Sequence, residues 1–91
     1  MDNELQNFCE EIIACLVKYG KVEKEAARRL VITSKICECK TELSKDLLFH
    51  EYPYYWAMHL LHSPSNPEWY QDRNLWPPSQ DYVDEFYRGT R

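Results

Sequence analysis

Two features that direct a protein to or through a membrane are missing from this sequence. No apolar run approaches the ~20 residues that a helix needs to cross a bilayer, so we expect no membrane span. The start, Met1 to Glu4, is acidic, whereas a secretory signal begins with basic residues and an apolar core. We therefore expect a cytoplasmic protein, in which the four cysteines stay reduced and form no disulfide framework.

The chain also lacks a pair of alternating segments that could form a sheet. Residues 36–40 alternate between two cysteines and other side chains, as a short strand does, but no second strand is visible to pair with it. We interpret this stretch as helix or as an extended connector. No internal repeat and no low-complexity segment is present, and the length of 91 residues predicts one domain, residues 1–91.

Basic residues are scarce in the second half of the chain. Residues 1–45 carry eight Lys or Arg and eight Asp or Glu, whereas residues 46–91 carry three Arg and seven acids, which gives the whole net charge of −4. A surface of this sign repels phosphates and suits a basic protein surface. We therefore expect a protein partner and no nucleic acid partner for this half.

The most informative stretch that is present runs from Tyr52 to His62, where apolar and aromatic side chains occupy almost every direction around a helix axis. Pro53 suits the first turn of a helix, because its missing N–H would be unpaired there anyway. Ser63, placed before Pro64, ends the helix. A helix that is apolar all round must be covered on several sides, so we predict that this is the central helix.

Amphipathic periodicity and capping residues predict the other helices. Apolar side chains recur at three- and four-residue steps from Leu5 to Tyr19, and Gly20 suits the C′ position after this helix. Further helices are expected at about residues 22–32, 42–50 and 80–88, the last two capped by Thr41 and Ser79. The prediction is a compact all-α domain of four to five helices, with the irregular Pro- and aromatic-rich segment 63–79 packed over the core.

Two cysteines and two histidines have the composition of a zinc site. A structural zinc ion requires four such ligands, but the Cys-x-Cys spacing is tighter than usual and the His-x-x-His spacing is at the short end. We interpret the cysteines as small apolar residues and expect neither a metal nor another cofactor. The alternative is a metal site built from Cys37, Cys39, His59 and His62.

No motif of an enzyme surrounds any cysteine, although Cys, His and acidic residues all occur. A helical domain of this size also has little room for a deep pocket, so we expect no enzyme. The alternative function is a helix-turn-helix DNA-binding regulator that uses Arg28 and Arg29 on the basic face of the second helix. Glu23 and Glu25 argue against it, because they occupy the first turn of that helix, where phosphate contacts are expected.

Aromatic residues are concentrated in the acidic half: eleven of the thirteen lie between positions 49 and 87. Tyr and Trp are favoured at protein interfaces, but the same rings can pin an irregular segment onto the helices. We predict a small non-catalytic protein-binding module of the inhibitor, immunity or adaptor type, whose partner has a basic surface. The predicted partner-binding residues are Trp69, Tyr70, Asp72, Trp76, Asp81 and Glu85.

Overall fold

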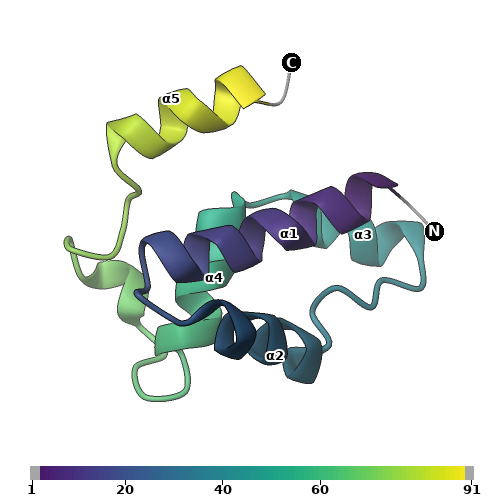
Figure 1. Cartoon of the computed structure of the whole chain (residues 1–91), viewed down its shortest axis with the longest axis horizontal. Helices are drawn as coiled ribbons and strands as arrows, with labels where there is room; N and C mark the ends of the chain where they lie inside the picture. Colours follow the sequence, from purple (N-terminus) through teal and green to yellow (C-terminus); the bar gives the residue numbers. More distant parts are fainter. Residues whose placement is uncertain (1–2, 90–91) are drawn as a thin grey trace.

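The computed structural model describes residues 3–89, with side chains as far as residue 86, and all regular structure in this part of the chain is helical (Figure 1). The all-α prediction is confirmed, with five α-helices. The elements in order are α1 (Asn3–Lys18), α2 (Lys24–Ser34), α3 (Glu42–Phe49), α4 (Pro53–His62), the 3-10 turn η1 (Trp69–Gln71) and α5 (Gln80–Gly89).

Helix α4 is the inner helix, as predicted. None of the side chains from 53 to 62 is fully exposed, and Pro53, Tyr54, Ala57 and Met58 are buried. α4 begins at Pro53 and ends at His62, where the N–H of the next residue donates to the His59 carbonyl at 3.0 Å. α1 packs along α4, and α2 packs against both of them (Figure 1).

One apolar core joins these helices. Ile12 and Leu16 of α1 have no exposed area, and they meet Ala27 and Val31 of α2 and Met58 of α4 in a single buried cluster. Full burial of each large aliphatic side chain contributes about 1.5–3 kcal/mol. The periodic apolar positions of α1 and α2 therefore form the core that their spacing predicts.

The turn between α1 and α2 differs from the expectation at Gly20. The left-handed conformation belongs to Lys21, whose φ is 58°, and not to the glycine. A Cβ on Gly20 would lie 2.7 Å from the Leu16 carbonyl oxygen and 2.8 Å from Leu61 Cδ2. Glycine is thus favoured because a Cβ would clash with the backbone carbonyl of Leu16 and crowd the Leu61 side chain, not because φ is positive.

The predicted N-caps are present, while α2 starts later than expected. The Ser44 N–H donates to Thr41 Oγ1 at 3.1 Å, and the Tyr82 N–H donates to Ser79 Oγ at 3.2 Å. Val22 lies in the turn before α2 and not in the helix, because its N–H is bonded to the carbonyl of Leu16 at 3.1 Å.

Aromatic packing fixes the segment between α4 and α5 to the core. Trp69 is completely buried, and its ring lies 5.3 Å from that of Tyr55 and 5.9 Å from that of Trp76, measured between centroids. Tyr54 Oη donates to the Leu75 carbonyl at 2.7 Å. These contacts hold the irregular segment over the helices.

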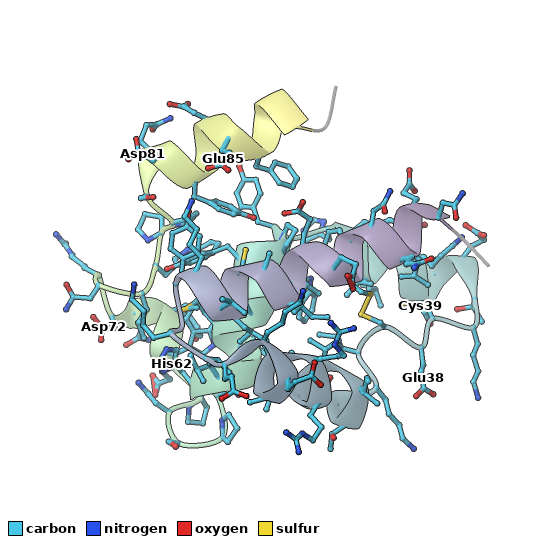
Figure 2. The ribbon with its side chains drawn as sticks, in the orientation of Figure 1. Glu38, Cys39, His62, Asp72, Asp81 and Glu85 are labelled. Carbon is cyan, nitrogen blue, oxygen red and sulfur yellow. A yellow bond between two sulfur atoms is a disulfide. The ribbon has the colours of Figure 1, made fainter. Side chains whose placement is uncertain are left out.

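The prediction that all four cysteines are reduced is wrong. Cys9 of α1 forms a disulfide with Cys37 in the connector after α2, with the two Cα atoms 6.3 Å apart (Figure 2). The stretch interpreted as helix or connector is both, because α2 continues to Ser34, residues 35–37 form a turn and residues 38–40 are irregular, and this path brings Cys37 back to α1. A pair separated by 28 residues leaves no local spacing to recognise. Cys15 and Cys39 are free thiols.

Candidate groove between α1 and α5

Helix α5 is attached to the rest of the fold by aromatic rings. Tyr82 is buried, and its ring meets those of Tyr19 at 5.7 Å and Tyr54 at 5.4 Å. Phe86, one turn further along α5, meets Tyr52 at 5.2 Å. Because these contacts come from one side of α5, the helix stands beside α1 without covering it (Figure 1).

A groove with a volume of about 690 Å³ lies between α1 and α5, and we call it the α1/α5 groove. Its apolar lining comes from Phe8 and Cys15 of α1, from Pro53, and from Tyr82 and Phe86 of α5. The size falls within the range of about 300–1,000 Å³ that is usual for ligand sites.

Ala14 is the smallest residue that lines the α1/α5 groove. It is exposed on the face of α1 that lines the groove. Because alanine has no side-chain atom beyond Cβ, α1 leaves free space at this position. A larger side chain here would occupy the groove without changing any charge.

Negative charge surrounds the α1/α5 groove. The lining residues include four glutamates and one lysine. The lysine, Lys18, lies with Nζ 3.5 Å from Glu85 Oε2, and both side chains are more than 60% exposed. Ion pairs this exposed contribute about 0–1 kcal/mol. The Tyr19 phenol, once ionised, and the Glu85 carboxylate raise the pKa of Lys18, which keeps this lysine charged.

The free thiols, Cys15 and Cys39, both have raised pKa values, so they stay protonated at neutral pH. Burial raises the pKa of Cys15 to about 12, and burial also raises the pKa of Tyr82, whose phenol hydrogen-bonds to this thiol. Burial raises the pKa of Cys39 as well. Since the thiolate is the reactive form of cysteine, neither thiol is activated as a nucleophile at neutral pH.

The three predicted aromatic anchors lie in different environments. Trp69 is completely buried, so it has no surface to offer a partner while the fold is closed. Trp76 is half-buried, and its ring packs against that of Tyr55 at 5.6 Å between centroids. Tyr70 is 47% exposed and is the one of the three that presents a large apolar area to solvent.

The three predicted acids are all exposed, but they do not form one cluster. Asp81 and Glu85 lie on α5, whereas Asp72 lies at a distance from them beside η1 (Figure 2). Asp72 Oδ1 accepts a hydrogen bond from the Asn74 N–H at 2.9 Å, within its own turn. Glu85 is the only predicted residue of the six that lines the α1/α5 groove.

Sequence reasoning missed the half of the groove that α1 provides. Phe8, Glu10, Glu11 and Ala14 line it, yet the chain shows them only as parts of an ordinary amphipathic helix. Charged residues border the apolar stripe of any amphipathic helix, so the sequence holds no signal that distinguishes these positions.

The alternative sites are less well supported by the described side chains. Cys37 forms a disulfide and therefore has no thiolate to offer a metal ion. Residues 3–86 contain no group of three or more His, Cys, Asp or Glu side chains that could hold a metal ion. On α2, Arg28 is half-buried with Nε 3.9 Å from Glu25 Oε1, while Arg29 is exposed. One of the two arginines that a DNA-binding face would use is thus directed at its own helix.

Among residues 3–89, no helix combines the length and the apolar character that crossing a membrane requires. The chain matches no family model, no curated protein and no solved structure.

Proposed function

We propose that this chain is a small non-catalytic binding module, of the inhibitor, immunity or adaptor type, whose partner is a protein with a basic surface. The observation that supports it is the α1/α5 groove, which combines an apolar lining with a glutamate rim. Apolar contact in such a site supplies affinity, while complementary charge orients the partner and speeds its approach. The groove is built on two helices, so its shape exists before a partner arrives.

The exposed acids of the C-terminal half extend this negative surface. Asp81 lies one turn before Glu85 on α5 and faces solvent, as does Asp72 beside η1. Tyr70 adds an exposed ring to the same segment. We propose that these residues form the outer part of the contact, where polar groups steer association more than they add affinity.

The non-catalytic part of the proposal is supported by the state of the thiols. Burial raises the pKa of both Cys15 and Cys39, so neither is activated for attack.

We propose a cytoplasmic location, a compartment that keeps most thiols reduced. There a cellular dithiol would reduce the Cys9–Cys37 disulfide to two thiols and would itself be oxidised to a disulfide.

Photo-crosslinking tests the proposal with the full chain. A photoreactive amino acid at position 11 or 85, on opposite walls of the α1/α5 groove, is expected to capture a protein with a basic surface. The matched control is the same amino acid at Arg29, which is exposed on α2. Capture of a basic protein from positions 11 and 85 but not from 29 supports the proposal, and capture from position 29 alone contradicts it.

A gel shift distinguishes the DNA-binding alternative. The proposal expects no shift of mixed duplex DNA at physiological salt, because the net charge of the chain is −4. Binding that weakens steeply with salt and disappears in the Arg28→Glu/Arg29→Glu variant would overturn the protein-binding proposal.

A further inference from the structure

We infer that the α1/α5 groove receives an amphipathic helix of the partner, apolar on one face and rich in Lys or Arg along its edges. The inference rests on the proposed function and specifies the form in which the basic partner is presented. It follows from the length of the groove, from its lining and from the placement of its charges.

The lining of the groove follows one face of α1 for almost the whole helix. Glu4, Phe8, Glu11, Cys15 and Lys18 all line it, at steps of three or four residues, which places them on the same side. With a rise of about 1.5 Å per residue, this face is about 21 Å long, or nearly four helical turns. A helix lying alongside α1 matches this length, whereas a single inserted side chain fills only part of it.

The lining also suits the row of apolar side chains on one face of an amphipathic helix. Phe8 and Phe86 are half-buried, and Tyr82 lies in the core with its ring 6.2 Å from that of Phe86, measured between centroids. Ala14 is exposed and is the smallest residue of the lining, so it leaves space on the α1 side of the groove. An amphipathic helix places apolar side chains at positions i, i+3 or i+4, and i+7 along one face, which is how helices bind in grooves of this kind.

Charge selects a cationic helix over other apolar ones. Glu10 and Glu11 stand on the α1 side of the groove and Glu85 on the α5 side, and all three are exposed. A helix between them meets negative charge on both edges, so it requires Lys or Arg on both sides of its apolar face. Lys18 sits at the C-terminal end of α1, so we place the cations that face α1 toward its N-terminal half. Glu85 meets a cation of the partner by exchanging its exposed ion pair with Lys18, a pair worth about 0–1 kcal/mol.

Peptide binding to the full chain tests this inference. The probe is a synthetic peptide of about 16 residues, long enough for the groove, with leucine on one helical face and lysine elsewhere. The control peptide has the same composition in an order that has no apolar face. We expect the amphipathic peptide to bind and to gain helicity in circular dichroism, and the control peptide to bind at least about tenfold more weakly, or 1.4 kcal/mol.

Filling the groove gives a matched pair of variants. Ala14→Phe puts a ring into the groove, whereas Ala26→Phe puts the same ring on an alanine of α2 that is also exposed and does not line it. Ala14→Phe is expected to weaken the amphipathic peptide roughly tenfold or more, and Ala26→Phe is expected to leave it unchanged. Equal affinity for both variants would overturn the inference.

A second pair of variants changes charge without adding volume. Glu11→Gln/Glu85→Gln removes two charges from the groove, and Glu38→Gln/Asp46→Asn removes two exposed charges elsewhere, from the connector and α3. The first variant is expected to bind the peptide about three- to tenfold more weakly, and the second to bind like the parent chain. Equal weakening by both pairs would contradict insertion in the groove.

The outcomes separate this inference from the proposed function. If both peptides bind alike, or the amphipathic peptide stays unfolded, while positions 11 and 85 still crosslink to a basic protein, the helical form of the partner is wrong and the function stands. If neither peptide binds and neither position captures a basic protein, both the helical partner and the proposed function are wrong.

Discussion

The backbone N–H of Tyr54 donates a hydrogen bond to Tyr82 Oη at 3.2 Å, which joins the first turn of α4 to the first turn of α5 across 28 residues. The N–H groups in the first turn of a helix have no partner inside the helix. The phenol of a distant helix therefore caps α4, and the same contact fixes α5 beside α1. Together with the contact between the rings of Phe86 and Tyr52, this side chain holds α5 beside α1.

Replacing the phenol tests this link. Tyr82→Phe keeps the ring and leaves the buried Tyr54 N–H without its acceptor, so we expect a loss of about 1–3 kcal/mol in the free energy of unfolding, measured by urea denaturation. The control is Tyr70→Phe, since that ring is 47% exposed and the change should cost almost nothing. Equal stability of the two variants would show that the hydrogen bond does not hold α5.

The two neighbouring aromatics of η1 should differ sharply in what they contribute to stability. Trp69 is completely buried, and Tyr70 is 47% exposed. We expect Trp69→Ala to lower the free energy of unfolding by about 3–5 kcal/mol because it leaves a large cavity. Tyr70→Ala should change it by about 0.5 kcal/mol or less. A larger loss for Tyr70→Ala than for Trp69→Ala would show that Trp69 is not buried, and Trp69 would again be a candidate partner contact.

The disulfide should be one of the larger contributions to the stability of the fold. Closing a loop between cysteines 28 residues apart lowers the entropy of the unfolded chain by an amount worth about 3–4 kcal/mol. We expect the Cys9→Ser/Cys37→Ser variant to lose a comparable free energy of unfolding, measured under non-reducing conditions.

The control for the disulfide is Cys39→Ser, which removes a free thiol and should have little effect. Alkylation of the unfolded chain without reductant gives a second check. It should modify two of the four cysteines, Cys15 and Cys39. Modification of all four would show that the bond is absent.

Alkaline pH should destabilise the fold through Cys15. Burial raises the pKa of this thiol from 9.0 to about 12, so above pH 9 the unfolded chain releases a proton that the folded chain retains. The contribution is complete below pH 9 and is lost as pH rises toward 12, at up to about 1.4 kcal/mol per pH unit.

The variant that isolates this effect is Cys15→Ala. It removes the titrating thiol, so its free energy of unfolding should fall less steeply than that of the parent chain between pH 9 and pH 11. Tyr82, whose pKa burial also raises, remains in both proteins. Parallel pH profiles would exclude Cys15 as a source of the alkaline sensitivity.

Local signals predicted the helices well, because each depends on a few neighbouring residues. Pro53 and Thr41 mark helix starts by their own backbone chemistry, and the apolar character of α4 follows from its composition. Contacts between distant segments leave no such signal. The Cys9–Cys37 pairing depends on the path of a connector, and the burial of Trp69 depends on where η1 lands against α4.

In the candidate site, too, the sequence predicted some residues and gave no signal for those that distant segments bring together. Glu85 was predicted as part of an acidic, aromatic half, and it does line the groove. Its counterparts Glu11 and Ala14 belong to the other half of the sequence and become part of the site only because Tyr82 docks α5 beside α1. A single helix wheel shows which face is apolar, but it does not show that a second helix leaves part of that face open.

The most direct test of the groove is a nuclear magnetic resonance titration of the isotope-labelled full chain with the leucine and lysine amphipathic peptide. We predict that the backbone amide shifts concentrate along the groove face of α1, at Phe8, Glu11 and Ala14, and at Glu85 and Phe86 of α5, while Arg29 of α2 stays unchanged. Shifts centred on α2, or spread evenly over the charged surface with none at Ala14, would contradict binding in the α1/α5 groove.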